Sequence, residues 1–396
     1  MAPPAPLSPS GALRIRHPAS LYFGPGAIVQ LPAVLAELGL GRPLVVTDAH
    51  LAELGLAARL VDDLGAAGIT AVVWPEAQVD PHDGHALACA EALRTCGHDS
   101  VLALGGGSVI DLAKVAALMA RYTGPITELY GLDAVKAPGL PLIAVPTTAG
   151  GGGEVSSHAV LMHREPRKKA VVGGPFVLPV ATLVDPWLTL TLPWRETLHA
   201  AVDGLIHAIE AFVARKANLF SDSWVRQAVP RILSALPRLK GDPTDLAARE
   251  ELSLGCLFSS LAMANANAGA IHALGYPLNL HFGVPHGLAN AIMAPSLLAV
   301  TCQARPERCA ELAGFFVGRP ARAAELPSLV ASFLTGLGLT DGLADWSISE
   351  NDLEWLAREA TAYGPVLANT PVQLSEADLA TVYRDAWQSD LEEARR

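Results

Sequence analysis

The 396-residue sequence has few cysteines and none of the cysteine pairs that hold a metal or a redox centre. The five cysteines form no C-x-x-C motif, and their odd number argues against a disulfide framework. A reducing, cytoplasmic environment is therefore expected. The first residues lack both a positively charged start and an apolar segment, so residues 1–12 are expected to form a flexible tail and not a signal peptide.

The sequence also lacks an excess of basic residues and a long unbroken apolar run. With a net charge of −11, nucleic acid is not an expected partner, because binding to a phosphate backbone needs a basic face. The most apolar stretches, 170–193 and 289–300, are interrupted by Gly, Pro or Asp, so no membrane span is expected. The 51% hydrophobic content is ample for a large core, and 396 residues predict two domains.

Short apolar segments alternate with helical segments in the first half of the chain. This alternation predicts a doubly wound, mostly parallel α/β domain over residues 13–190. Beyond about residue 193 the strand signals fade, which predicts an α-helical domain over 191–396. The expected strands of the first domain are 43–47, 70–74, 100–104 and 142–145, and its expected helices are 51–67, 85–96 and 109–121.

A glycine-rich turn follows the third of these expected strands. The sequence 100–114 reads as a buried strand, three glycines and a helix that begins near Ser108. It matches neither the G-x-G-x-x-G fingerprint nor the P-loop pattern. Bare glycine amides at a helix N-terminus nevertheless favour an anion such as a phosphate, because the N–H groups and the helix dipole both face it. Tight turns between strands and helices also need glycine, so this turn alone is moderate evidence for a nucleotide.

One carboxylate and three imidazoles in the second half have the spacing of metal ligands. Asp203 and His207 lie four residues apart in a helical pattern and so project from one face. His272 is expected to end an Ala/Asn/Gly-rich helix, and His286 to open the next one after Val-Pro. An Asp and a His at this spacing are more often a surface pair, but three nitrogens and one oxygen suit Zn²⁺ or Fe²⁺. With the glycine turn in the other domain, the active site is expected between the two.

Together these motifs resemble the iron-containing (group III) alcohol dehydrogenases. The resemblance runs in order from about residue 20 to residue 385 and is specific for the family, but not for any one substrate. The motifs that carry it are F-G-P-G-A-I from Phe23, G-G-G-S-x-x-D-x-A-K from Gly105, P-T-T-A-G from Pro146 with Glu154, Asp185-Pro186, Asp203-x-x-x-His207, His272 and P-H-G-x-A-N-A from Pro285.

The resemblance implies a dinucleotide-binding domain, a helical metal domain and interconversion of a small alcohol with an aldehyde or ketone by hydride transfer. It implies NAD(P), Fe²⁺ or Zn²⁺, and a homodimer. The metal ligands would be Asp203, His207, His272 and His286. The residues expected to bind the cofactor are Gly105, Gly106, Gly107 and Ser108 at the pyrophosphate, Asp111 of the same motif, Thr147 and Thr148 on the adenine side, and Lys169 near the ribose, where a solvated surface lysine is the alternative.

The sequence departs from the family at several positions. Tyr276 stands where many members carry another histidine, so it is either a proton relay or an aromatic wall of the substrate pocket. His281 is a second relay candidate and more typical of a helix or pocket residue than of a fifth ligand. Gly151 and Gly153 stand where members often show Thr and Ser, which removes side-chain hydrogen bonds to the cofactor.

Two further expectations concern the cofactor and the reaction class. Asp48 ends an expected strand, where a carboxylate accepts hydrogen bonds from a ribose and repels a 2′-phosphate, so NAD is expected over NADP. Its alternative role is that of an N-cap for the next helix. A metal-dependent lyase of the dehydroquinate synthase type with bound NAD, or a maleylacetate reductase-like enzyme, are the alternative reaction classes, although the P-H-G-x-A-N-A segment follows the dehydrogenase pattern.

Overall fold

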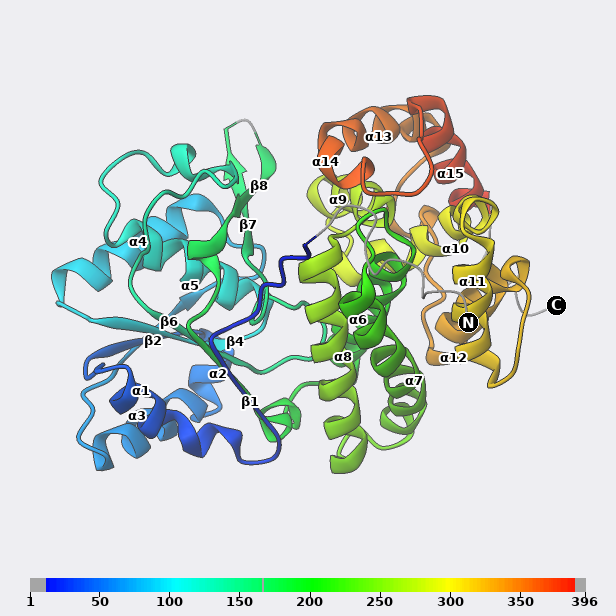
Figure 1. The fold of residues 1–396 in the computed structure, drawn as a ribbon. Helices are drawn as coiled ribbons and strands as arrows, with labels where there is room; N and C mark the ends of the chain where they lie inside the picture. Colours follow the sequence, from blue (N-terminus) through cyan, green and yellow to red (C-terminus); the bar gives the residue numbers. More distant parts are fainter. Residues whose placement is uncertain (1–11, 166, 389–396) are drawn as a thin grey trace. The chain divides into compact units, whose positions relative to one another are not determined.

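A computed structural model describes residues 12–165 and 167–388, so most of the expected tail at 1–12 lies outside the described residues. The described chain forms two compact units (Figure 1). The N-terminal unit comprises residues 16–192, and the helical unit comprises residues 193–388 together with residues 12–15. Each unit buries its own set of apolar residues.

The N-terminal unit is built on a six-stranded parallel sheet with the order β1-β9-β6-β4-β2-β3. Helices connect the strands and cover the sheet, so the expected doubly wound α/β class is confirmed. The strands are β1 Ser20–Phe23, β2 Pro43–Asp48, β3 Val72–Ala77, β4 Ser100–Gly105, β6 Leu142–Pro146 and β9 Ala181–Val184. The helices are α1 Leu31–Glu37, α2 Ala49–Glu53, α3 Leu56–Ala66, α4 Asp83–Thr95 and α5 Gly107–Met119.

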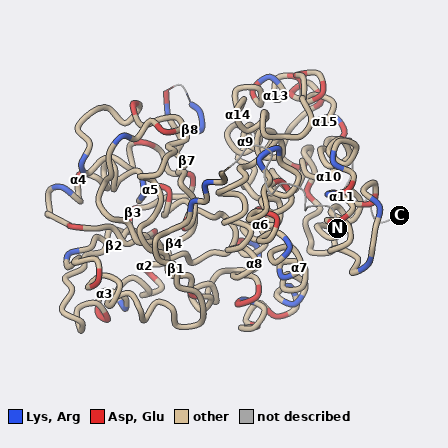
Figure 2. Tube along the Cα trace, in the orientation of Figure 1, with Lys and Arg blue, Asp and Glu red and all other residues tan. Residues whose placement is uncertain are grey.

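The central strand β4 shows how the sheet is buried on both faces. Val101 and Ala103 point into a core cluster with α4 and α5, whereas Leu102 and Leu104 point into a second cluster with α1 and α3. Strands β4, β6 and β9 carry no charged residue, and the trace of β4 is tan in Figure 2. The C-terminal end of β4 leads directly into α5, which places the glycine turn at the carboxyl edge of the sheet.

A smaller sheet with the order β5-β8-β7 was not predicted from the sequence. It consists of β7 His158–Arg164 and β8 Arg167–Gly173, which pair antiparallel, and the short β5 Gly131–Leu132. Its exposed positions carry Arg and Lys, so the hairpin lacks the continuous apolar pattern of the parallel strands. The edge strand β1 and its neighbour β9, each four residues long, were also not predicted.

The helix predicted over 51–67 is wrong as a single element. The structure has two helices there, α2 and α3, separated at Gly55, whose φ of +76° is left-handed. A left-handed residue cannot continue an α-helix, and glycine adopts this conformation without steric cost. The segment is therefore divided into the short α2 and the longer α3.

The helical unit has ten α-helices and no strand among its described residues, as expected. The long α6 is buried along almost its whole length and packs against α7, α8 and α10. The helices are α6 Trp194–Val213, α7 Leu219–Gly241, α8 Leu246–Ala266, α9 Ala270–Phe282, α10 His286–Ala304, α11 Pro306–Val317, α12 Leu326–Leu337, α13 Leu353–Ala360, α14 Gly364–Leu367 and α15 Glu376–Gln388.

Helix α10 is long and apolar enough, by length and composition alone, to cross a bilayer. However, 67% of its apolar window is buried inside the structure, and α6, α9 and α12 pack against it. Packing in the core therefore accounts for its apolar composition.

Candidate active site

The glycine turn of the N-terminal unit forms the start of α5. Gly106 is the N-cap of α5, and no side chain caps this end of the helix. A Cβ at Gly105 would lie 2.5 Å from Val109, so the turn needs glycine there for steric reasons. A Cβ at Gly107 would meet nothing within 4 Å, so its main chain is open on that side. The unpaired N–H groups and the helix dipole at this end favour a phosphate.

The loop that carries Thr147 and Thr148 lies against this turn. The main-chain N–H of Thr147 donates to the carbonyl oxygen of Gly105 at 3.1 Å, and a Cβ on Gly106 would lie 3.1 Å from the Thr148 methyl group. Farther along the loop, a Cβ at Gly153 would lie 3.2 Å from Ile110. The glycine that replaces the family's usual side chain thus allows the loop to pack closely on α5.

A buried lysine anchors the end of this loop to α5. The Nζ of Lys114 donates to the carbonyl oxygens of Ser156 and His158 at 2.9 and 2.7 Å and to the Ser156 hydroxyl at 3.1 Å. Burial lowers the pKa of Lys114 to about 8, although Asp111 and Glu154 act in the opposite direction. The Asp111 carboxylate accepts a hydrogen bond from the main-chain N–H of Val160 at 2.9 Å. Asp111 therefore holds β7, whatever contact it makes with a cofactor.

Lys169 is not a solvated surface lysine. Its side chain is 9% exposed, and its Nζ lies 2.7 Å from Oδ1 of Asp80. The main-chain N–H of Asp80 in turn donates to the Ser108 hydroxyl at 3.3 Å, and Asp80 itself has a left-handed φ of +48°. Asp80 thus links two of the predicted cofactor residues. Sequence reasoning missed it, because nothing local distinguishes this aspartate from a turn residue.

Asp48 is the last residue of β2 and the N-cap of α2. Its Oδ1 accepts a hydrogen bond from the main-chain N–H of Leu51 at 2.9 Å. The N-cap role weighed as an alternative is therefore present in the structure. It occupies one carboxylate oxygen, and a ribose contact through the other is compatible with it.

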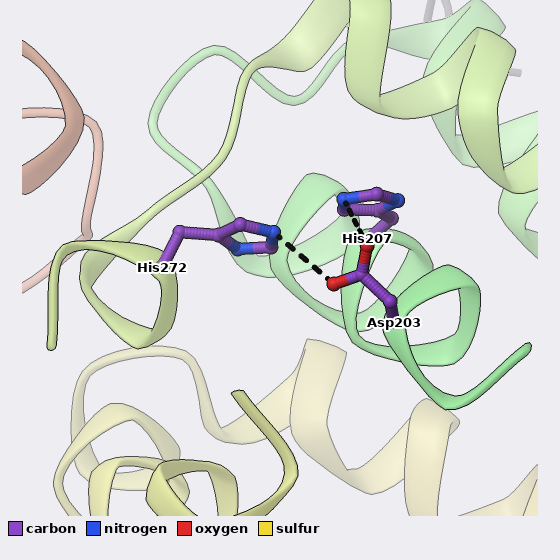
Figure 3. Close-up of side chains that lie close together, drawn as sticks. All are labelled: Asp203, His207 and His272. Atoms are coloured by element: carbon purple, nitrogen blue, oxygen red, sulfur yellow. Dashed lines mark ion pairs between the residues drawn. The ribbon is translucent and has the colours of Figure 1, made fainter. Parts of the chain in front are cut away.

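The helical unit brings three of the four predicted metal ligands into one buried group. The ligand atoms of Asp203, His207 and His272 all lie within 4.8 Å of one another, and their side chains converge in Figure 3. Nε2 of His207 and Nε2 of His272 each lie 3.6 Å from a carboxylate oxygen of Asp203. The two imidazoles stack with their centroids 4.8 Å apart. Asp203 and His207 come from successive turns of α6, as their spacing predicts.

The fourth predicted ligand, His286, is the first residue of α10 and lies beside this group. Its Nε2 is 3.8 Å from Oδ1 of Asp203, and its side chain is 35% exposed. The Pro-His-Gly sequence opens α10 as predicted. Gly287 explains the glycine of that motif, because a Cβ there would lie 2.0 Å from the carbonyl oxygen of His199 on α6.

The expectation that His272 ends a helix is wrong: it lies in the first turn of α9. Helix α8 ends at Ala266, and Asn267 has a φ of +61°, which breaks the helix before α9 begins. The side-chain amide of Asn369 donates to the carbonyl oxygens of residues 266, 267 and 268 and so stabilises the break.

The electrostatics of the group keep the Asp203 carboxylate ionised. Burial alone would raise the pKa of Asp203, but the imidazoles of His207, His286 and His272 lower it to about 2. Asn290, the buried asparagine of the P-H-G-x-A-N-A motif, to which sequence reasoning assigned no role, also donates from Nδ2 to Oδ1 of Asp203 at 2.8 Å. Its position four residues after His286 in a helix is the signal that could have found it.

The two proton-relay candidates are placed differently. The ring of Tyr276 stacks on that of His286 with centroids 5.6 Å apart and also contacts His272. His281 pairs instead with Glu359, 3.4 Å from its Nε2, and packs edge-on against Trp355. Nine residues of helix separate His281 from His272, about 13 Å along the axis. The structure therefore brings Tyr276, and not His281, to the ligand group.

The donors of the group fit a divalent metal. Nε2 of His272 is buried and makes no hydrogen bond, although its ring is held in place from the other side. A buried nitrogen without a hydrogen-bond partner is costly unless something binds it. Imidazole nitrogens with one carboxylate oxygen are the donor set of Zn²⁺ and Fe²⁺ sites.

The fold and the two sites thus define an enzyme that combines an α/β phosphate-binding unit with a helical metal-binding unit. Residues 18–186 match the family model "Iron-containing alcohol dehydrogenase", and residues 197–387 match "Fe-containing alcohol dehydrogenase family, C-terminal". The chain therefore belongs to the iron-containing alcohol dehydrogenase family, and the resemblance inferred from the motifs is confirmed. It is an oxidoreductase that acts on CH–OH groups.

Individual relatives cover nearly the whole chain. Long-chain-alcohol dehydrogenase 1 of Geobacillus thermodenitrificans is 31% identical over 97% of this chain and 99% of the relative. The NAD-dependent methanol dehydrogenase of Bacillus methanolicus is 32% identical over 87% and 92%, respectively. The solved structure of sulfoacetaldehyde reductase from Bifidobacterium kashiwanohense in complex with NAD⁺ has a TM-score of 0.88 at 28% identity and covers 96% of this chain and 100% of that one.

Proposed function

We propose that this protein is an NAD(H)-dependent, metal-requiring dehydrogenase that interconverts a small alcohol with its aldehyde or ketone. The observation that carries the proposal is the buried group of Asp203, His207 and His272, whose ligand atoms lie within 4.8 Å of one another. The glycine turn before α5 supplies the second element, an anion site suited to the pyrophosphate of the cofactor. The relatives named above act on alcohols or aldehydes and support this substrate class.

In this proposal Asp203, His207, His272 and His286 hold one Fe²⁺ or Zn²⁺ ion. When bound, the ion would polarise the substrate oxygen, and the nicotinamide would exchange a hydride with the adjacent carbon. The protein's part is to fix the ligands. Asn290 holds the Asp203 carboxylate, and the low pKa of about 2 keeps that carboxylate ionised for metal binding over the ordinary pH range.

Tyr276 is our candidate for the residue that relays a proton at its Oη. Its ring stacks on the His286 imidazole and tilts against Tyr363, with centroids 4.7 Å apart. A phenol donates or relays a hydrogen bond but is a poor base at neutral pH. The variant Tyr276→Phe keeps the ring and removes the hydroxyl. A loss of kcat with an unchanged substrate KM would support the relay, whereas unchanged kinetics would leave Tyr276 as a wall of the substrate pocket.

One experiment tests the reaction class and the metal together. The metal content of the purified protein is measured, and the same preparation is mixed with NADH and a panel of small aldehydes while absorbance at 340 nm is followed. Oxidation of NADH that is lost on chelation and restored by Fe²⁺ or Zn²⁺ is expected. No change at 340 nm would favour a lyase of the dehydroquinate synthase type. Full activity after exhaustive metal removal would favour a maleylacetate reductase-like enzyme.

We also propose a cytoplasmic homodimer. All five cysteines are free, and Cys96 is exposed, which is compatible with a reducing compartment. The dimer follows from the family resemblance. Light scattering coupled to gel filtration would test it, and a monomeric mass at micromolar concentration would contradict it.

A further inference from the structure

A buried glutamate lies one helical turn beyond the predicted metal ligands of α6. Glu210 follows His207 by three residues, lies on the same face of α6 as Asp203 and His207, and is only 3% exposed. A buried carboxylate is costly unless its oxygens receive hydrogen bonds. The partners of this carboxylate therefore show what it does.

The Glu210 carboxylate accepts three hydrogen bonds, all from the start of α9. Its Oε1 accepts from the main-chain N–H of Ile271 at 2.7 Å, and its Oε2 accepts from the main-chain N–H of Gly269 at 3.0 Å. Oε2 also lies 2.5 Å from Nδ1 of His272. The approach is close: a Cβ on Gly269 would lie 2.9 Å from Oε1.

Both oxygens of Glu210 already accept hydrogen bonds from main-chain N–H groups, and Oε2 has the same acceptor role toward Nδ1–H of His272. An imidazole that donates from Nδ1 has Nε2 as the nitrogen that can bind a metal. This is the buried nitrogen without a hydrogen bond, 3.6 Å from Oδ1 of Asp203. Glu210 thus selects the tautomer of His272 and fixes the direction of its ring.

We propose that Glu210 is a positioning residue that prepares His272 as a metal ligand, an inference that rests on the metal site of the proposed function. It acts through His272 and does not touch substrate. Carboxylate–histidine–metal arrangements of this kind orient the ring and raise its basicity. The two main-chain hydrogen bonds from the start of α9 also fix the carboxylate to the helix that carries His272.

The alternative is that Glu210 only caps α9. The chain offers a matched control, because Thr370 caps the same helix end: its Oγ1 accepts from the main-chain N–H of Ala270 at 2.8 Å. Thr370 has no hydrogen bond to His272 among those of the described residues. Thr370→Val therefore removes a buried cap of α9 and leaves the imidazole contact in place.

The informative variant is Glu210→Gln, which keeps the size of the side chain and replaces one oxygen by an NH₂ group. If the NH₂ group faces Ile271, two donors oppose each other. If it faces His272, it donates to Nδ1 and moves the imidazole proton to Nε2, the atom that must bind metal. Neither orientation preserves all three hydrogen bonds.

The experiment measures Zn²⁺ affinity of the full-length, metal-stripped protein by competition with a chromophoric chelator, together with the unfolding temperature of the same metal-free protein. Glu210→Gln is expected to weaken Zn²⁺ binding by roughly 10- to 100-fold. Thr370→Val is expected to lower the unfolding temperature and leave Zn²⁺ affinity within about twofold of wild type, because its contact does not involve a ligand. Glu210→Asp keeps the charge but shortens the reach, so an intermediate Zn²⁺ affinity is expected.

Wild-type Zn²⁺ affinity in Glu210→Gln would overturn the inference. An equal loss of Zn²⁺ affinity in Glu210→Gln and Thr370→Val would also overturn it, because both residues would then act only as caps of α9. Should Glu210→Gln not fold, Glu210→Asp decides in its place, and wild-type affinity there overturns the inference. A wild-type protein that binds no Zn²⁺ would overturn the metal site of the proposed function and this inference with it. That outcome is distinct, since it is seen before any variant is made.

Discussion

In the proposed function, the glycine turn of the N-terminal unit and the ligand group of the helical unit each bind a charged group, one with main-chain atoms and the other with side chains. The turn uses main-chain N–H groups of consecutive residues, and its side chains matter chiefly by being absent, as at Gly105. The ligand group uses side chains from three helices that are up to 83 residues apart, counted from Asp203 to His286. The turn therefore depends on local geometry, whereas the ligand group depends on how the helices pack.

The largest effect is expected where a single side chain cannot be replaced. His272→Ala or His286→Ala should lower turnover by roughly 10³-fold or more, since metal catalysis supplies several kcal/mol of transition-state stabilisation. Metal content should fall as well, because a methyl group cannot replace an imidazole. NADH binding, followed by fluorescence titration, should stay largely intact, since the glycine turn belongs to the other unit. A parallel loss of NADH binding would contradict the independence of the two sites.

The second variant, Gly107→Glu, changes the glycine turn and not the ligand group: it adds a charge without disturbing the fold of the turn. A Cβ at Gly107 would meet no neighbouring atom within 4 Å. Gly107→Glu should therefore fold, and its carboxylate at the helix N-terminus interacts favourably with the helix dipole. It would nevertheless repel the pyrophosphate, and like charges about 5 Å apart at an effective dielectric constant near 20 cost about 3 kcal/mol, or roughly 10²-fold in NADH affinity.

Metal content measured on the same Gly107→Glu preparation should match wild type. Gly107→Gln is the matched control, with the same length and no charge, and should bind NADH more tightly than the glutamate variant. If both variants bind NADH as wild type does, the turn is not the pyrophosphate site.

The contrast between the sites also explains how far the sequence could predict them. The strand, three glycines and helix around Ser108 are contiguous, so the turn could be predicted with its helix start correct to one residue. Asp203 and His207 could be paired by helical spacing, but the place of His272 in the first turn of α9 could not. That place depends on the break at Asn267, which is stabilised by Asn369 from a distant segment.

Elements whose stability comes from distant partners were missed for the same reason. The hairpin of β7 and β8 alternates buried with partly exposed residues and is exposed and basic only near its turn, so it lacks the continuous apolar run of the parallel strands. It is fixed to α5 by Lys114 and Asp111. Glu210 has no local signal beyond its spacing from His207. Its role is visible only when α6 and α9 lie side by side, with the carboxylate at the start of α9.

Next to the glycine turn, which uses main-chain groups, Lys114 is a buried side chain that anchors the adjacent loop to α5. Its pKa of about 8 in the folded protein is below the unfolded value of 10.5, so the unfolded chain binds more protons between these values. Stability therefore rises as pH increases from about 8 towards 10.5, and the desolvation penalty is fully present below pH 8. Between pH 8 and 10 the unfolding free energy of wild type, relative to Lys114→Met, should rise by about 2 kcal/mol.

Urea denaturation of both proteins at several pH values provides this measurement, and the difference between them cancels the titration of groups common to both. A difference that falls with increasing pH would mean that Lys114 has a raised pKa and forms a net favourable ion pair with Asp111 or Glu154.

The smallest effect is expected at Asp48, whose carboxylate has two roles: it caps α2, and we expect it to contact the cofactor ribose. Its Oδ1 caps α2 through the N–H of Leu51, and we expect the rest of the carboxylate to favour the ribose of NAD and repel the 2′-phosphate of NADP. Asp48→Gly should narrow the preference for NADH over NADPH by roughly tenfold, the value of one charge contact of about 1.4 kcal/mol.

Asp48→Asn retains a side-chain oxygen for the cap and removes only the charge, so it should narrow the preference for NADH to a similar degree with a smaller loss of stability. The ratio of kcat/KM for the two cofactors measures the preference, and a wild-type enzyme that already uses NADPH as well as NADH would exclude this role for Asp48 and leave it as the cap of α2.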